Sequence, residues 1–221
     1  DTHDLLKRDG LATLGRQLSP LQCGQVRDYL KAAQAFPGHV PAKGDNRTSI
    51  LTENYDESHA SYSLATNVGA PHLLEFFTSD PILDVVSRYL GGRKITLYSM
   101  NTWWNYPRPG RISNDHRDMV DEGTVSVFVY LTPVLTLADG PHVAYPGTHR
   151  DKDDLDMTGR THRTVLGDEG TAFIEDPMTG TGNAFAAHAP DAPSPNANTV
   201  PFHVVPSYDS TFKSTIRVPV L

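Results

Sequence analysis

His116 and Asp118, near the middle of the chain, are separated by a single residue and could bind one metal ion together. On an extended strand, the side chains of residues i and i+2 point to the same face. An imidazole nitrogen and a carboxylate oxygen would then provide two thirds of the 2-His-1-carboxylate site that holds non-haem Fe(II). Because the chain has ten histidines, such a pair also arises by chance, and a polar turn before a strand is the alternative.

The segment that follows this pair, from Thr124 to Thr132, has the composition of a β-strand. An aliphatic set of residues alternates in it with an aromatic or hydroxylated set: Val125, Val127, Val129 and Leu131 against Ser126, Phe128 and Tyr130. This alternation predicts a strand that is covered on both faces, as in the inner layer of a sandwich or barrel.

Four landmarks lie in order along this region: His116-Arg117-Asp118, Tyr130-Leu131-Thr132, Asp139-Gly140-Pro141 and Pro146-Gly147-Thr148-His149-Arg150. Together they resemble the phytanoyl-CoA dioxygenase family of Fe(II)/2-oxoglutarate-dependent oxygenases, most strongly over residues 93–176. The resemblance implies a mostly β fold, a double-stranded β-helix or cupin-like jelly roll, with N-terminal helices packed outside it. We expect one domain over residues 1–221, in which residues 1–92 give helical and loop support and residues 93–221 form the jelly-roll core.

The resemblance also implies a reaction. Fe(II) held by His116, Asp118 and a second histidine would use 2-oxoglutarate and O2 to oxidise a small-molecule substrate, with release of succinate and CO2. Related halogenases have a small residue where Asp118 stands, so this carboxylate favours hydroxylation of an unactivated C–H bond, or another oxidation such as desaturation. The motifs do not select a substrate or an oligomeric state.

The second histidine is displaced in this sequence. In the family it lies on a late strand, within a few residues of a segment that corresponds to residues 170–176. Residues 177–183 contain no histidine here. We place this ligand at His188, which follows a short apolar run and precedes prolines, and keep His203 as the alternative.

The far carboxylate of 2-oxoglutarate needs a buried cation, and the planar guanidinium of arginine suits it. In the family this arginine follows the second histidine by about one strand and a turn, a window that has no arginine after His188. Arg217 is the predicted anchor, with a surface cation as the alternative interpretation. Lys213 and Arg111 are further candidates.

Residues 94–106 read as another strand, which in the family lines the active site beside the metal. Tyr98, Asn101 and Trp103 are therefore candidate contacts to 2-oxoglutarate or substrate, as is Ser126 on the central strand. The alternative is a core strand that uses aromatic residues to bury area.

Helix signals in the first third of the chain locate the supporting elements. Residues 2–10 predict a short helix closed by Gly10, followed by a strand over residues 11–14. A helix starts at Ser19-Pro20 with Gln22 completing a capping box, and another runs from Ser79-Asp80-Pro81 to Gly91-Gly92. Residues 37–68 show no period and are expected to form a surface excursion. The apolar face of the helix after Ser19 is predicted to be Val26, Tyr29, Leu30 and Ala33.

Composition narrows the class of protein. A net charge of −7 without a basic run argues against nucleic-acid binding, and no apolar run is long enough for a membrane span. Cys23 is the single cysteine, so a reducing, cytoplasmic compartment is expected.

Because the second histidine and the arginine depart from the family pattern, two alternatives stay open: a non-catalytic binding domain, and a cupin-like metalloenzyme that does not use 2-oxoglutarate.

Overall fold

The computed structural model describes residues 1–37, 59–93, 95, 97, 99–105, 116–117, 124–151, 157–183 and 202–205. The strands in these ranges are β1 (Leu11–Arg16), β2 (Phe36–Pro37), β3 (His59–Ser61), β4 (Asn101–Asn105), β5 (Ser126–Tyr130), β6 (His142–Tyr145), β7 (Arg163–Thr164), β8 (Thr171–Glu175), β9 (Gly180–Asn183) and β10 (Phe202–Val205). They form a seven-stranded sheet in the order β1-β8-β5-β10-β4-β3-β2 and a three-stranded sheet in the order β7-β6-β9. All described pairings are antiparallel.

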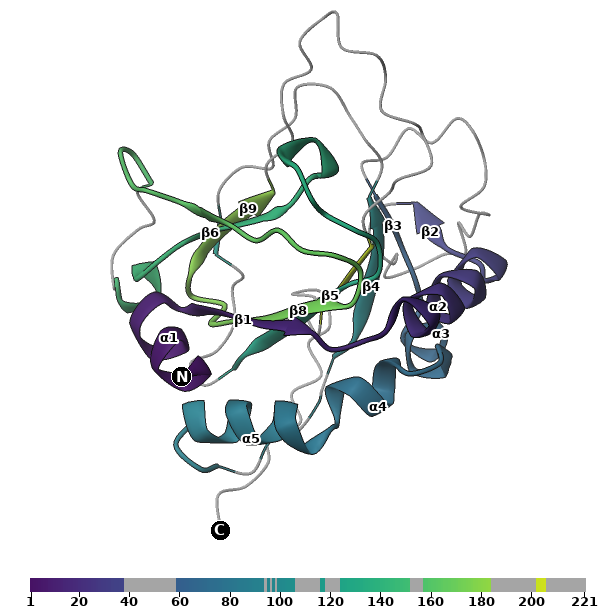
Figure 1. The fold of residues 1–221 in the computed structure, drawn as a ribbon, viewed down its shortest axis with the longest axis horizontal. Helices are drawn as coiled ribbons and strands as arrows, with labels where there is room; N and C mark the ends of the chain where they lie inside the picture. The colour runs from purple at the N-terminus through teal and green to yellow at the C-terminus, as the bar shows by residue number, and fades with distance from the viewer. Residues whose placement is uncertain are drawn as a thin grey trace, which may run out of the picture.

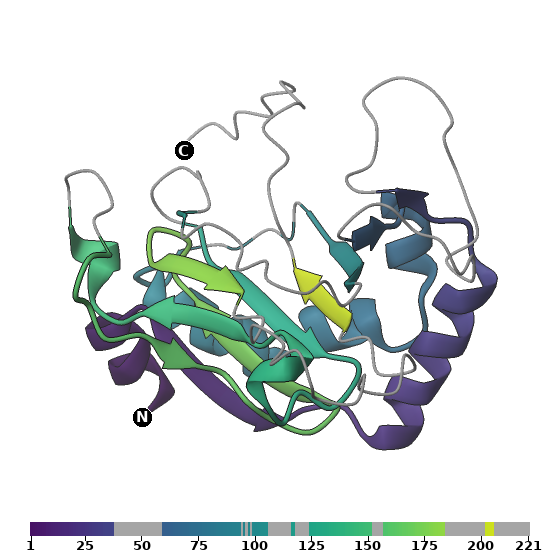
Figure 2. The ribbon, with the colours of Figure 1, turned by 90° about the horizontal axis from the view of Figure 1, so that it is seen from above.

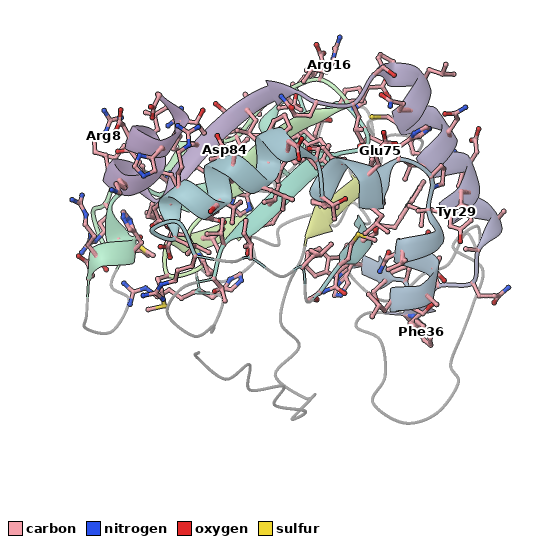
Figure 3. All side chains as sticks on the ribbon, turned by 90° about the horizontal axis from the view of Figure 1, so that it is seen from below. Arg8, Arg16, Tyr29, Phe36, Glu75 and Asp84 are labelled. Carbon is pink, nitrogen blue, oxygen red and sulfur yellow. The ribbon has the colours of Figure 1, made fainter. Side chains whose placement is uncertain are left out.

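The described helices are α1 (Thr2–Asp9), α2 (Pro20–Ala32), α3 (Leu64–Gly69), α4 (Leu73–Phe77) and α5 (Asp80–Tyr89), with short 3-10 turns η1 (Leu137–Asp139) and η2 (Thr148–Arg150). Helices α4 and α5 lie under one face of the larger sheet, and β6 and β9 lie over its other face (Figure 1). The same helices stand in front of the sheet in the view from below, with Asp84 and Glu75 on them (Figure 3). The fold is therefore mixed α and β, and the expectation of a mostly β chain was too strong. No helix of the described ranges is long and apolar enough to cross a membrane.

The helix caps follow the sequence signals. Gly10 ends α1 in the left-handed conformation at φ 75°, and Ser19 and Gln22 form the predicted capping box of α2. Helix α5 begins after Ser79, and Gly91 with φ 77° follows its end. Gly10 and the Ser19–Gln22 pair cap their helices within a few residues, whereas Ser79 begins α5 without a side-chain cap hydrogen bond.

Two expectations about this region were wrong. Tyr29 was expected on the apolar face of α2, but its side chain is 38% exposed. The buried face of α2 consists of Cys23, Val26 and Leu30. Within the expected surface excursion over residues 37–68, residues 59–61 form β3 and residues 64–68 lie in α3; residues 38–58 lie outside the described ranges. Asn67 of α3 is buried and donates from its amide to the carbonyl oxygens of Tyr62 and Met100, which fixes α3 beside β4.

The two faces of the larger sheet carry different cores, as the alternation in β5 predicted. Val127, Val129 and Ile174 pack on the helix side, with Leu6, Val26 and Leu30 among the helical residues. Phe128, Tyr130 and Phe173 pack on the opposite side, between the two sheets, against Val134, Ala144 and Val165. The central strands are thus buried on both faces.

The Pro146–Arg150 motif holds the end of α1. The backbone N–H of Gly147 donates to Asp9 O (2.8 Å), and Arg150 donates to Arg8 O (2.8 Å). His149 Nε2 lies 3.2 Å from Lys7 O, the third of these carbonyl acceptors. These contacts satisfy carbonyl groups that the end of a helix leaves without intrahelical partners. In this chain the motif therefore joins the N-terminal helix to the smaller sheet.

Gly170 provides a test of the close approach between β8 and the start of α2. Gly170 has φ +84°, and a Cβ there would lie 1.9 Å from Leu18 O, whereas Gly15 has φ +71° and open space around it. Alanine at either position costs about 1–2 kcal/mol for the left-handed backbone. We expect Gly170→Ala to lose about 1–3 kcal/mol more, because the clash is with backbone. Urea unfolding of both variants measures the difference, and equal losses would contradict the contact.

Cys23 lies in the helix-side core and is fully buried. Burial raises the pKa of its thiol from 9.0 to about 11. Because the thiolate is the reactive form, we expect Cys23 to resist a disulfide reagent such as DTNB at pH 8 and to react once urea unfolds the chain. Between pH 9 and 11 the unfolded chain releases this proton while the folded chain retains it, so its contribution to the free energy of unfolding falls as pH rises. Rapid labelling of the native protein would show that the helix packing is wrong.

Candidate metal centre

His116 extends the smaller sheet beyond β9. Its backbone N–H donates to Thr181 O (2.9 Å), and the N–H of Thr181 donates to His116 O (2.8 Å). Two residues that exchange both hydrogen bonds are directly opposite in an antiparallel pair, so their side chains lie on the same face. The His116 side chain is exposed. Of the predicted His-x-Asp pair, His116 lies in the described ranges, and it is an extended residue beside β9.

Strand β9 is the late strand that follows residues 170–176, where the family pattern places the second histidine. It reads Gly180-Thr181-Gly182-Asn183, and Thr181 is the residue opposite His116. Thr181 is buried, and its hydroxyl donates to Val143 O at 3.0 Å. The strand position beside His116 thus carries a small hydroxyl residue.

A buried pair of ionisable residues lies next to Thr181. His142 Nε2 is 2.9 Å from Glu175 Oε2 and 3.0 Å from Thr181 Oγ1. The His142 and Glu175 side chains are 7% and 1% exposed. The His142 ring lies 5.1 Å from the ring of Phe128 and 5.0 Å from that of Phe173. The pair therefore occupies the aromatic layer between the sheets, on the same side as His116.

Sequence reasoning did not single out His142 or Glu175. His142 follows a turn, and Glu175 ends an otherwise uncharged strand, so neither stands in a recognisable motif. The signal that could have identified the pair was the carboxylate of Glu175, which stands two residues after Phe173 and therefore faces inward on the same side of the strand. A buried carboxylate needs a partner, and the partner lies 33 residues earlier in the chain.

Tyr130 links the two sheets behind this pair. Its hydroxyl donates to Val165 O (2.9 Å) and accepts from the backbone N–H of His142 (3.1 Å). Burial is the main cause that raises the pKa of Tyr130 above its ordinary value, so the phenol stays protonated. The hydrogen bonds hold β6 at a fixed distance from β5, and with it the backbone of His142.

The predicted contact residues are distributed along the inner face of the larger sheet. Ser126 is buried and lies opposite Glu175 in the pairing of β5 with β8. Trp103 is partly buried and packs against the inner core. Asn101, two residues before it, belongs to the same face of β4. Ser126 is therefore close to the His142–Glu175 pair, while β4 is separated from β5 by β10.

Six predicted site residues lie outside the described ranges: Asp118, Tyr98, His188, Arg217 and the further anchor candidates Lys213 and Arg111. Their roles stay predictions. The alternative second histidine, His203, lies in β10, where its backbone is opposite Tyr130 on one side and Trp103 on the other. Figure 2 shows β10 as the short yellow strand of the larger sheet.

Two antiparallel sheets, with His116 extending the smaller one beyond β9, are the arrangement of a double-stranded β-helix. The family model of phytanoyl-CoA dioxygenase (PhyH) matches residues 6–201. The chain belongs to this family of Fe(II)/2-oxoglutarate-dependent oxygenases. A search of curated proteins finds no match.

Solved structures share the fold at low sequence identity. AviO1 from Streptomyces viridochromogenes Tue57 is 16% identical, with a TM-score of 0.62 over 92% of this chain and 91% of its own. The epimerase SnoN from nogalamycin biosynthesis, in complex with Fe3+, alpha ketoglutarate and nogalamycin RO, is 15% identical, with a TM-score of 0.62 over 92% and 81%. EctD from S. alaskensis, with 2-oxoglutarate and 5-hydroxyectoine, is 19% identical, with a TM-score of 0.61 over 92% and 74%.

Proposed function

We propose that this protein is an Fe(II)/2-oxoglutarate-dependent dioxygenase that hydroxylates an unactivated C–H bond of a small molecule. The observation that carries the proposal is the position of His116, paired with buried Thr181 on the face that carries the aromatic layer. Its imidazole and the carboxylate of Asp118 are the donors that suit Fe(II). Complexes of SnoN and EctD with 2-oxoglutarate on the same fold support the choice of cosubstrate.

We assign the proposed roles in metal, cosubstrate and substrate binding from the positions of the residues. His116 and Asp118 would hold Fe(II), which when bound supplies the site where 2-oxoglutarate and O2 react. Phe128 and Phe173, whose rings stack at 4.6 Å, exclude water from the back of that site. Trp103, Asn101, Tyr98 and Ser126 are proposed to contact cosubstrate or substrate, and Arg217 to pair with the far carboxylate of 2-oxoglutarate.

The proposal is tested by anaerobic titration of Fe(II) and 2-oxoglutarate into the apoprotein. Chelation of the iron by 2-oxoglutarate gives a weak visible charge-transfer band, and we expect this band only when both components are present. Release of succinate in the presence of O2 is the second measurement. Absence of iron binding would overturn the proposal.

One observation favours a second candidate function. Strand β9, which should carry the second histidine, carries Gly180-Thr181-Gly182-Asn183. A family member that has lost this ligand would act as a binding domain without oxidising what it binds. Iron binding without the charge-transfer band, and without succinate formation, is the result that would select this alternative.

A further inference from the structure

We propose that Arg117 is a positioning residue of the metal centre, which holds the His116–Asp118 segment against the Pro146–Arg150 motif. This inference rests on the proposed function, because it concerns the orientation of the residues that would bind Fe(II). The Nη2 atom of Arg117 donates to Thr148 O at 2.7 Å. The two residues are 31 positions apart, in two motifs that the sequence indicates separately. This hydrogen bond joins the motifs directly.

Thr148 is a fixed point, because three elements converge on it. Its side chain is fully buried. The hydroxyl donates to Tyr145 O at the end of β6 (2.7 Å) and accepts from the N–H of Gly180 at the start of β9 (2.8 Å). The carbonyl oxygen of Thr148 accepts from Arg117. The guanidinium therefore binds a residue whose position is determined by two strands of the smaller sheet.

Two anchors of different kinds set the course of the metal segment. The backbone of His116 exchanges both hydrogen bonds with Thr181, at 2.9 and 2.8 Å. Within the described ranges this pair is an isolated bridge rather than part of a longer strand. Such a bridge fixes the segment at one residue and leaves its direction to other contacts. Arg117 provides a second anchor one residue further along, through its side chain.

Alternation of side chains connects this anchor to the metal ligands. On an extended segment, neighbouring side chains point to opposite faces, and side chains two residues apart point to the same face. The prediction that His116 and Asp118 bind one ion therefore requires residue 117 to be held on the other face. The hydrogen bond from Arg117 to Thr148 meets this requirement, because it draws the side chain of residue 117 toward the buried threonine.

The chemistry of the contact favours arginine over lysine. The Arg117 side chain is partly buried, and its guanidinium is a planar group with donors in fixed directions. Hydrogen bonds from a charged donor are roughly twice as strong as those between neutral groups. Lysine has the same charge on a flexible stem, without the fixed fork. We therefore expect lysine to retain part of the effect of Arg117, and alanine to retain none.

Arg150 provides a matched control from the same motif. It also donates from Nη2 to a main-chain carbonyl group, Arg8 O, at 2.8 Å. That bond holds the end of α1, whereas the bond from Arg117 holds the metal segment. Replacement of either arginine removes a charged donor from a carbonyl oxygen, and only replacement of Arg117 releases the residue next to His116.

The test compares metal affinity in matched variants of the chain. Anaerobic titrations with Fe(II) and Co(II) would be made on wild type, Arg117→Ala, Arg117→Lys and Arg150→Ala. We expect Arg117→Ala to weaken binding about 10–100-fold, the range found for residues that orient metal ligands. Arg117→Lys should lose less than Arg117→Ala, and Arg150→Ala should bind as wild type does. Arg117→Lys serves the same comparison if the alanine variant does not fold.

The visible spectrum of bound Co(II) separates positioning from a purely structural role, because it depends on the coordination geometry of the ion. At saturating Co(II), and at a temperature where a thermal melt shows the apoprotein to be folded, we expect the spectrum of Arg117→Ala to differ from that of wild type. Wild-type affinity and spectrum in Arg117→Ala, or an equal loss in Arg150→Ala, would overturn the role of Arg117 and leave the oxygenase proposal standing. If wild type itself binds neither metal, the oxygenase proposal fails first, and the role of Arg117 falls with it.

Discussion

His116→Ala is expected to abolish turnover of 2-oxoglutarate and to weaken Fe(II) binding by at least about 100-fold, more than the loss of an outer-shell partner. The reason is local, because His116 belongs to the extended pair with Thr181 and its imidazole is the nitrogen donor of the predicted His-x-Asp pair. Its side chain is exposed and belongs to neither hydrophobic core, so the substitution leaves both cores in place. Succinate formation and anaerobic iron titration measure the two effects.

The control for this prediction is His162→Ala. His162 is also exposed, and its ring lies 6.0 Å from that of Tyr145 between centroids. We expect wild-type iron affinity in this control, and changes in stability within about 0.5 kcal/mol for both variants. Undiminished succinate formation in His116→Ala would remove His116 from the site.

Phe173→Ala is expected to lower the free energy of unfolding by about 3–5 kcal/mol. Phe173 is fully buried at the centre of the inner core and contacts three rings. It is stacked on Phe128 at 4.6 Å, meets Tyr130 edge-on at 5.4 Å and lies 5.0 Å from His142. Removing the ring leaves a cavity between two sheets that hydrogen bonds hold apart, so the site cannot collapse to fill it. Urea unfolding monitored by far-UV circular dichroism measures the loss.

Leu21→Ala is the matched comparison, because Leu21 is 72% exposed and buries little surface. Its expected effect is within about 0.5 kcal/mol. A loss below about 1 kcal/mol in Phe173→Ala would mean that the two sheets do not pack through this ring. The result would then contradict the inner core and, with it, the setting of His142.

The sequence predicted best the elements whose signals are local. Gly10, the Ser19–Gln22 capping box and the Ser79-Asp80-Pro81 start each specify a helix end within four residues, and the structure has all three. Helix α3 was missed because it spans only Leu64–Gly69 and is fixed by Asn67, whose partner Met100 is 33 residues away. No short window of sequence contains that bond.

The same distinction applies to the site. His116 could be identified because its partner in the motif is two residues away. His142, Glu175 and Thr181 come together only when β6, β8 and β9 are assembled, across separations of up to 39 residues. Alternation in β5 correctly predicted which side of the strand is aromatic. It could not indicate that a histidine from another strand would join that layer.

The contacts at the end of α1 have a consequence for synthesis of the chain. Strand β1 pairs with β8, Gly10 O accepts from Asp176 N–H, and Asp9 O accepts from Gly147 N–H. A ribosome makes β1 more than a hundred residues before either partner, so its edge stays without its native neighbour for most of translation. Topologies dominated by such distant contacts fold slowly, and exposed strand edges aggregate. Chaperone dependence during expression is therefore expected, together with refolding yields that fall as protein concentration rises.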